Sequence, residues 1–384
     1  MHLTRDIGAS LRAGHPWVFS DVVRMPRGMQ AGDVATLHAP DGRFLARGLV
    51  DPESDLAFRV FTLRRDEGVD GDLLTRRLEA ALDLRTSIVS PDISGLRLVH
   101  GENDHLPGFQ VDRYGSVLSI RSDGRMGLAW EDRVIDRLCA LLPSSSAVVA
   151  RNPHATEGRA RLVRGALDGP VTIVEEGRRF LVDVMTGQKT GFFLDQRDNR
   201  SRVARLAPDR RVLNLFAYTG GFSVAAALAG ARQVHTVDIS PAAVELAREN
   251  FRLNGVNPAD HAFTTADAFD VLEEAASRPG EWDVIVVDPP SFASSRRTRT
   301  RALGAYRRLN RLAMQALAPG GWLATATCSS HVSESDFLTV LGEAAGEAGR
   351  QMTLAGVHGA GADHPVRLGF PEGRYLTFVL GRLH

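Results

Sequence analysis

The feature that most constrains the fold is a regular alternation of apolar strands and helices from about residue 176 onward. Seven short segments rich in β-branched residues are the strand candidates: 210–216, 233–238, 261–267, 282–290, 320–328, 351–359 and 375–383. Helix-like segments separate most of them, which predicts a parallel sheet covered by helices on both faces. We therefore expect an α/β protein whose C-terminal part is a Rossmann-like sheet, with ligands bound beyond the C-terminal strand ends.

Two smaller domains are expected before this sheet. Residues 1–75 carry short alternating apolar segments with turn signals, and Asp41-Gly42 between two of them favours a β-hairpin. Residues 76–175 combine helix-like and strand-turn-strand patterns. The predicted organisation is a small β-rich domain over 1–75, a small α/β domain over 76–175 and the Rossmann-like domain over 176–384.

Composition excludes several classes of protein. The chain is 43% hydrophobic and 24% charged, as globular proteins are, and no apolar run approaches the roughly 20 residues of a membrane-spanning helix. Two distant cysteines cannot form a disulfide framework and the first residues lack the apolar core of a signal peptide, so a cytoplasmic location is expected. The 46 basic residues balance the 46 acidic ones, so any affinity for nucleic acid must come from local patches. Lys189 is the only lysine.

The ends of the first three predicted strands indicate a cofactor that contains adenosine. The first strand runs into a turn with Gly220 and Gly221, where the backbone can approach a ligand and the next helix offers free N–H groups. The second ends at Asp238, whose carboxylate can accept both ribose hydroxyls, and the third ends at Asp267, placed to meet an adenine amino group. The G-x-G-x-x-G fingerprint of NAD and FAD sites is absent, which disfavours a nicotinamide oxidoreductase.

This layout resembles the class I S-adenosylmethionine-dependent methyltransferases, in which the glycine turn holds the methionine part of the cofactor and the two acids hold ribose and adenine. The resemblance implies S-adenosyl-L-methionine as the cofactor. Taken alone, each acid at a strand end is explained equally well as the N-cap of the next helix. Their joint occurrence, followed by Asp288-Pro289-Pro290, favours the cofactor.

Asp288 and Cys328 follow the fourth and fifth predicted strands and are the candidate catalytic pair. If these strands are neighbours, their backbones lie about 4.8 Å apart and both side chains face one pocket. Addition of a thiolate to C6 of cytosine makes C5 able to take a methyl group, and a carboxyl group can support protonation at N3. The alternative for Cys328 is a small buried hydrophobe, which is the interpretation preferred for Cys139.

Several motifs together resemble the RlmI-type family of large-subunit ribosomal RNA cytosine-C5 methyltransferases, in order and nearly end to end. They are GHPWVFS, GLRLVHGENDHLPGFQVDRYG, MTGQKTGFFLDQRDNR, NLFAYTGGFS, DPPSFA, ATCSSHV and ADHPVRLGFPEGRYL. The resemblance implies an N-terminal PUA domain, a central α/β domain and a C-terminal class I methyltransferase domain that acts on ribosomal RNA. It also implies Cys328 as the nucleophile and Asp288 as its acidic partner.

The same resemblance implies the cofactor contacts, which are Phe216, Ala217, Tyr218, Thr219, Gly220, Gly221, Asp238, Ile239, Asp267, Ala268 and Asp288. It adds Lys189, Phe193, Asp195 and Gln196 from a segment that closes over the cofactor, in which Phe192 and Phe193 are alternatively core residues. Other RNA cytosine-C5 methyltransferases carry a second cysteine after the double proline. This chain has Ser291 there, as RlmI-type proteins do, so the release of product has no assigned residue.

The segment after the double proline is the predicted RNA contact. The candidates near the active-site mouth are Pro289, Pro290, Arg296, Arg297 and Arg299. Clustered arginines can neutralise phosphates, and Tyr306 can stack on a base. For Arg307, Arg308 and Arg311 a solvated helix face is an equally good explanation. Trp17 can also stack on RNA, but a tryptophan in a small β domain is more often part of its core.

Two rival functions remain open at this stage. A guanine-modifying ribosomal RNA methyltransferase also uses a double proline after an aspartate and needs no cysteine nucleophile. A non-catalytic RNA-binding protein with a vestigial methyltransferase domain is the second rival, although the intact set of candidate residues argues against decay. No metal site is predicted, and a homodimer is among the oligomeric states that the sequence leaves open.

Overall fold

A computed structural model describes residues 1–152, 159–293, 296–329 and 331–384. The chain forms two compact units, each assembled from three stretches. The first unit contains residues 1–174, 182–194 and 362–373, and the second contains residues 175–181, 195–361 and 374–384. The three domains predicted from the sequence stay a prediction, since this division places residues 1–75 and most of 76–175 in one unit.

The first unit begins with a six-stranded sheet in the order β2-β6-β5-β4-β1-β3. Its elements are β1 (His2–Leu3), α1 (Gly8–Arg12), β2 (Trp17–Val18), β3 (Val23–Arg24), β4 (Val34–His38), β5 (Phe44–Val50) and β6 (Phe58–Thr62). The expected hairpin at Asp41-Gly42 is confirmed: β4 and β5 pair antiparallel, and Gly42 adopts the left-handed φ of 85° that such a turn requires. Leu37, Val50 and Phe58 lie in its buried core.

A second sheet in the first unit has the order β11-β10-β9-β8-β7. Its elements are α2 (Gly71–Ile88), β7 (Gly95–His100), β8 (Phe109–Tyr114), β9 (Val117–Ser122), α3 (Gly124–Leu141), β10 (Ala147–Arg151) and β11 (Ala160–Gly165). Asp70 is the N-cap of α2, and its side chain accepts a hydrogen bond from the N–H of Leu73. The strands β12 (Val171–Glu175) and β13 (Arg178–Val182) form a separate two-stranded sheet.

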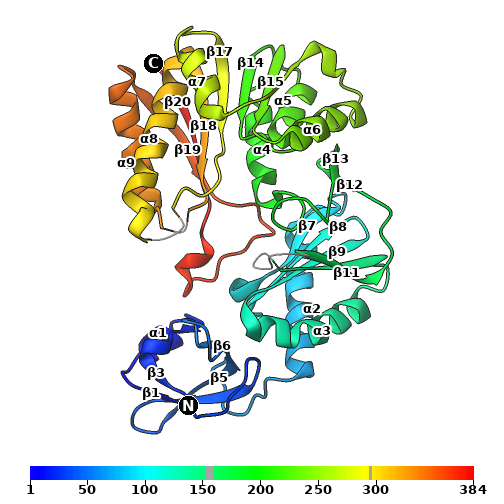
Figure 1. The fold of residues 1–384 in the computed structure, drawn as a ribbon, viewed down its shortest axis with the longest axis vertical. Helices are drawn as coiled ribbons and strands as arrows, with labels where there is room; N and C mark the ends of the chain where they lie inside the picture. Colours follow the sequence, from blue (N-terminus) through cyan, green and yellow to red (C-terminus); the bar gives the residue numbers. More distant parts are fainter. Residues whose placement is uncertain (153–158, 294–295, 330) are drawn as a thin grey trace. The chain divides into compact units, whose positions relative to one another are not determined.

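The second unit contains the predicted Rossmann-like sheet of seven strands, in the order β16-β15-β14-β17-β18-β20-β19 (Figure 1). The strands are β14 (Arg211–Leu215), β15 (Gln233–Asp238), β16 (Ala262–Thr265), β17 (Trp282–Val287), β18 (Leu317–Thr327), β19 (Met352–His358) and β20 (Thr377–Leu383). All seven expected strands are confirmed. The fully parallel arrangement is wrong in one place, because β20 runs antiparallel to both of its neighbours. The residues between β19 and β20 hold no α-helix, and a parallel connection usually needs a crossover helix.

Helices cover both faces of this sheet. They are α4 (Arg197–Ala204), α5 (Gly221–Leu228), α6 (Pro241–Leu253), α7 (Ala268–Ala276), α8 (Arg299–Ala316) and α9 (Glu334–Glu347). A continuous core joins α7, α8 and α9 to the buried side chains of one face, such as Ile285 and Leu323. The helices α5 and α6 contact β15. Among the described helices, none has the length and apolar character needed to cross a membrane.

Candidate active site

The turn after β14 holds a strained backbone at the carboxyl edge of the sheet. Phe216 and Tyr218 have φ values of 54° and 49°, in the left-handed region that non-glycine residues avoid. The N–H of Ala217 donates to the carbonyl of Val237 at 2.9 Å, which fixes the turn against β15. Such strain, of about 1–3 kcal/mol per residue, persists only where the surroundings impose it and is typical of ligand sites.

Gly220 is required at the end of this turn for two reasons. Its φ is 78°, and a Cβ atom added there would lie 2.9 Å from the Cβ of Ala247 on α6. The close approach lets α5 begin at Gly221 directly beside the turn, where the first N–H groups of the helix have no intrahelical partner. A backbone with free N–H donors in this position fits the carboxylate and polar end of a methionine-type ligand.

Asp238 is locked at the end of β15. Its Oδ2 accepts a hydrogen bond of 2.7 Å from the N–H of Tyr218, and its Oδ1 accepts one of 2.9 Å from the N–H of Ser240. The carboxylate therefore joins the glycine turn to the start of α6, while each oxygen keeps a second lone pair for a ribose hydroxyl. The next residue, Ile239, is 72% exposed, an unusual exposure for an isoleucine at a strand end.

Asp267 is the N-cap of α7, which is the alternative to a cofactor contact that the sequence left open. It is exposed, and its side chain accepts a hydrogen bond of 2.8 Å from the N–H of Phe269 as the N-cap of α7. Ala268 is buried at the start of that helix. Capping occupies one carboxylate oxygen, so a second role toward adenine is compatible with this geometry.

Asp288 leaves β17 in front of two prolines and is oriented from α4. The Nε2 of Gln196 donates a hydrogen bond of 2.9 Å to Oδ2 of Asp288. The Oε1 of Gln196 in turn accepts from Nδ2 of Asn199 at 2.7 Å, and both amides are buried. The sequence predicted Gln196 as a cofactor contact but did not predict a role for Asn199. The only indication of such a role in the sequence is that Asn199 is a polar residue within α4.

Cys328 directly follows β18, which pairs parallel with β17 as expected. Its Sγ lies 4.0 Å from the carbonyl oxygen of Pro289, the residue after Asp288. Cys328 is half-buried, so the sulfur is neither sealed in the core nor fully in solvent. The structure therefore brings the two predicted catalytic segments together. Cys139, by contrast, packs at the edge of a hydrophobic core, as predicted.

A set of hydroxyl groups ties the two catalytic segments to each other. The Oγ of Ser329 is 2.8 Å from the Oγ of Ser291 and 3.1 Å from the hydroxyl of Tyr306. The Oγ1 of Thr327 donates to the same tyrosine hydroxyl at 2.9 Å. Burial raises the pKa of Tyr306, and the electrostatic interaction with Cys328 adds to that rise.

The prediction that Tyr306 stacks on a base is wrong. Its side chain is completely buried, with its ring between those of Phe292 and Phe337 at centroid distances of 4.9 and 5.5 Å. The many arginines of α8 made the whole helix look solvent-exposed in the sequence. Tyr306, however, lies on the face of the helix that packs against the core. Its hydroxyl group contacts the side chains of Thr327 and Ser329, one on each side of Cys328.

The arginines near the double proline divide into paired and unpaired side chains. Arg299 forms an ion pair of 2.6 Å with Asp336. The side chains of Arg307, Arg308 and Arg311 all pair with glutamates, as expected for a solvated helix face. Arg297 is exposed and makes no ion pair within the described residues.

The remaining RNA and cofactor candidates occupy several environments. Pro289 is buried and Pro290 is exposed, whereas the side chain of Arg296 lies outside the described part of the chain. Thr219 is buried in the second unit. Asp195, also in that unit, accepts a hydrogen bond of 2.6 Å from the hydroxyl of Tyr375.

Four of the residues considered belong to the first unit. The ammonium of Lys189 lies 4.4 Å from the centroid of the Phe193 ring. Trp17 donates from Nε1 to Glu102 at 2.9 Å and packs on the ring of Phe370, which supports a structural role for it. Phe192 is buried, as its core interpretation required.

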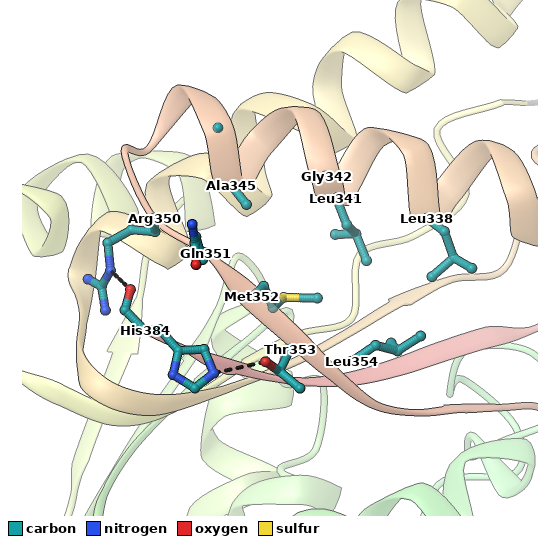
Figure 2. A pocket seen from close by; sticks show the side chains of 11 residues that line it. Leu338, Leu341, Gly342, Ala345, Arg350, Gln351, Met352, Thr353, Leu354 and His384 are labelled. Atoms are coloured by element: carbon teal, nitrogen blue, oxygen red, sulfur yellow. Dashed lines mark hydrogen bonds between the residues drawn. The ribbon is translucent and has the colours of Figure 1, made fainter.

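A groove of about 610 Å³ lies elsewhere in the second unit, between α9 and the edge strand β19 (Figure 2). Figure 2 shows Leu338, Leu341 and Ala345 on the helix facing Met352 and Leu354 on the strand. Met352 pairs with Leu383 at the end of β20, and β20 runs antiparallel to β18. The groove is therefore at the opposite end of β18 from Cys328 and contains none of the predicted site residues.

Comparison with known proteins agrees with this geometry. Residues 154–356 match the family model of S-adenosylmethionine-dependent methyltransferases, and residues 1–63 match a PUA-like domain. A methyltransferase structure from Streptococcus mutans, described as SAM-dependent, superposes with a TM-score of 0.88 at 21% identity and covers 100% of this chain and 99% of its own. A second methyltransferase, SMU.776 in complex with SAH, gives 0.87 at 22% identity and covers 97% of each chain. At these identities the likeness concerns the fold.

Curated relatives are closer in sequence. Ribosomal RNA large subunit methyltransferase I of Shewanella denitrificans is 37% identical over 97% of this chain and 96% of its own length. The protein of the same name from Aeromonas salmonicida is 37% identical over 100% of this chain and 98% of its own. The expected α/β fold with a PUA-like domain and the expected cofactor, S-adenosyl-L-methionine, are thereby confirmed. The chain belongs to the S-adenosylmethionine-dependent methyltransferases, in the family whose curated members are named ribosomal RNA large subunit methyltransferase I.

Proposed function

We propose that the protein methylates carbon 5 of a cytosine in large-subunit ribosomal RNA and that Cys328 is the nucleophile. The names of the curated relatives support the RNA substrate. The position of Cys328 supports the choice of base, and the single observation that carries it is the 4.0 Å distance from Sγ to the carbonyl of Pro289, next to Asp288. A guanine nitrogen carries its own lone pair and would need no sulfur there.

The cofactor would lie along the carboxyl edge of the sheet. The turn from Phe216 to Gly221 would hold its methionine part, and Asp238 its ribose, with Ile239 and Asp267 on the adenine side. When bound, S-adenosylmethionine supplies the methyl group that the cytosine receives. These residues fit such a ligand because contacts within the protein hold the turn and the carboxylate in place.

The catalytic steps use two side chains of this chain. The thiolate of Cys328 adds to C6, and the electron pair of the C5–C6 double bond becomes available at C5. The carboxyl of Asp288, held by Gln196, shares a proton with N3 and limits the charge that develops on the ring. After C5 has gained the methyl group it loses its proton to a base that has no assigned residue. The double bond then re-forms and expels the thiolate.

A mechanism-based trap tests this proposal. Ribosomal RNA with 5-azacytidine in place of cytosine is incubated with the full chain and S-adenosylmethionine, and covalent protein–RNA complexes are separated under denaturing conditions. We expect a stable complex with the wild type and with Cys139→Ala, and none with Cys328→Ala. Cys139 is the matched control because it is the second of the two cysteines and lies in the other unit.

The nucleosides of methylated natural RNA distinguish the rival function. 5-Methylcytidine in digests of RNA treated with the wild type, and its loss with Cys328→Ala, is the expected result. A methylated guanosine that persists in Cys328→Ala would instead assign the protein to guanine modification. S-Adenosylmethionine binding without transfer to any ribosomal RNA would favour a protein that has lost catalysis.

A further inference from the structure

The segment 362–373 is fixed within the first unit at several points around Arg367. The N–H of Arg367 donates to Oδ1 of Asn103 at 3.0 Å. Gly369 approaches the backbone so closely that an added Cβ would lie 2.0 Å from the carbonyl oxygen of Ala13. The ring of Phe370 packs on Trp17 at a centroid distance of 4.7 Å. The backbone that carries Arg367 is therefore held in place by its neighbours.

The guanidinium of Arg367 lies close to Gly14. A Cβ at Gly14 would be 3.2, 3.4 and 3.6 Å from Nε, Nη2 and Cζ of Arg367, so the side chain rests on a surface that only glycine leaves free. Within the described residues no acceptor oxygen takes a hydrogen bond from this guanidinium and no carboxylate pairs with it. Partial burial lowers the pKa of Arg367, with no acid to offset the effect. A half-buried cation without an anion is unusual in a folded protein.

A second guanidinium, that of Arg77 on α2, belongs to the same cluster. It donates to the carbonyl oxygens of His105 and Phe61 and, among the described residues, has no carboxylate partner. Desolvation lowers the pKa of Arg77 to about 10; the charge of Glu67 opposes that shift, and the charge of Arg367 adds to it. Both arginines stay protonated at neutral pH, so they repel each other unless an anion lies between them.

His105 completes the cluster. Its φ of 58° places it in the left-handed region after the 3₁₀ turn Gly101–Asp104. The pKa of His105 is lowered to about 4, first by desolvation and then by Arg367 and Arg77, so its ring is neutral at pH 7. The adjacent Asp104 raises the pKa of His105, but less than desolvation, Arg367 and Arg77 lower it. The carboxylate of Asp104 is bound by the guanidinium of Arg85 at 2.6 and 2.7 Å.

We infer that Arg367, Arg77 and His105 form a binding site for one phosphate of the RNA backbone. Two guanidiniums that form no ion pair within the described residues supply the charge, and the neutral imidazole supplies one further N–H donor. The identification of the phosphate as part of RNA rests on the proposed function. The anion site itself rests only on the first unit, so the two can fail separately.

Binding of RNA at a series of salt concentrations tests the inference. Arg367→Gln should weaken RNA binding and reduce the slope of log affinity against log salt by about 0.7–0.9, the value for one lost phosphate contact. Arg367→Lys keeps the charge and should restore most of the slope. Arg64→Gln is the matched control, because Arg64 lies in the same unit but is exposed and paired with Asp66 at 2.9 Å. An unchanged slope in Arg367→Gln would overturn the inference.

Inorganic phosphate, used with the full chain, tests the anion site without RNA. In protein with ¹³C-labelled histidine, phosphate added at constant ionic strength should raise the pKa of His105 by offsetting the nearby guanidiniums, whereas chloride should not. His105→Gln assigns the signal, and the response should be lost in Arg367→Gln. Equal effects of phosphate and chloride would show general screening and overturn the site. A specific phosphate response in a protein that methylates no RNA would leave the site standing and reject only its RNA assignment.

Discussion

The amide of Gln196 and the carboxylate of Asp288 are joined by a hydrogen bond of 2.9 Å that links the start of α4 to the end of β17. Asn199 fixes the other end of the same amide and also donates to the carbonyl of Gly359 at 3.1 Å. Because these amides are buried, the orientation of Asp288 is set by the protein before substrate arrives.

Gln196→Ala should therefore slow methyl transfer about tenfold or more, since a hydrogen bond to a charged group contributes about 1.5–3 kcal/mol. RNA affinity should change little, because the amide acts through Asp288. Rates at saturating RNA and cofactor, together with RNA binding, measure the two effects. Gln351→Ala, at an exposed glutamine of the same unit, is the control. A full rate in Gln196→Ala would show that Asp288 needs no such support.

The two acids at the ends of β15 and β16 should respond differently to amide substitution. Asp238→Asn should weaken S-adenosylmethionine binding about 10- to 100-fold. A carboxylate accepts hydrogen bonds with both of its oxygens, whereas an amide accepts with its oxygen only, so the variant has fewer acceptors for the N–H of Tyr218 and a ribose hydroxyl. Asp267→Asn keeps a good N-cap and should leave the stability of α7 intact. Calorimetry with S-adenosylmethionine then shows whether Asp267 also contacts adenine. Equal affinities for wild type and Asp238→Asn would contradict the proposed cofactor position.

Gly220→Ala should destabilise the second unit and weaken cofactor binding. The new Cβ would meet Ala247 at 2.9 Å and the residue would keep a φ of 78°. Gly230→Ala is the matched control, since Gly230 has a φ of 89° but nothing lies within 4 Å of an added Cβ. We expect the free energy of unfolding to fall by about 1 kcal/mol in the control, because alanine is strained at a positive φ. It should fall clearly more in Gly220→Ala, where the new Cβ also meets Ala247. Thermal unfolding with and without cofactor compares them, and equal losses would reject the packing argument.

Tyr306→Phe should lower stability by about 1–3 kcal/mol while RNA affinity is retained. The substitution removes the hydrogen bonds of the tyrosine hydroxyl to Thr327 and Ser329, and the ring remains in the core. Denaturant unfolding measures the first effect and RNA binding the second. A loss of RNA affinity at unchanged stability would restore the stacking role that its burial contradicts.

Arg297 and Arg299 should contribute unequally to RNA binding. Arg297→Gln should reduce the slope of log RNA affinity against log salt concentration by about 0.7–0.9, the value for one phosphate contact. The exposed side chain of Arg297 makes no ion pair within the described part of the chain, so it is available to bind a phosphate. Arg299→Gln should have a smaller effect, because Arg299 must first leave Asp336. The same slope change in both variants would show that the ion pair does not restrict Arg299.

The ion pair also gives Arg299→Gln a signature in acid. The hydrogen bond from Arg299 is the largest cause of the lowered pKa of Asp336, followed by that from Ser333. The pKa of Asp336 is lower in the folded protein than its ordinary value of 3.8, so its ionised carboxylate stabilises the fold at a pH above 3.8. This stabilisation is lost as the pH falls through the pKa that Asp336 has in the folded protein. The difference in stability between Arg299→Gln and wild type, at most about 1 kcal/mol for a partly exposed pair, should therefore shrink below pH 3.8.

Local sequence was enough to predict the strands of the second unit and the segments that meet at its carboxyl edge. β-Branched runs, the glycine turn and the double proline act over a few residues, so their structural consequences are visible without the fold. Parallel pairing of β17 with β18 then brings Cys328 and Asp288 together, as the strand order of a Rossmann-like sheet implies.

Tertiary structure alone decided which polar groups are partners. Tyr306 and Arg307 are neighbours on α8, yet one is buried and the other exposed, because only the packing of α8 on the sheet selects the inward face. Gln196 and Asn199 bind Asp288 and Gly359, which are far from them in the chain, and the cluster of Arg367, Arg77 and His105 also joins distant residues. Hydrogen bonds and charge repulsion depend on distances in space, and the sequence specifies those distances only through the folded chain.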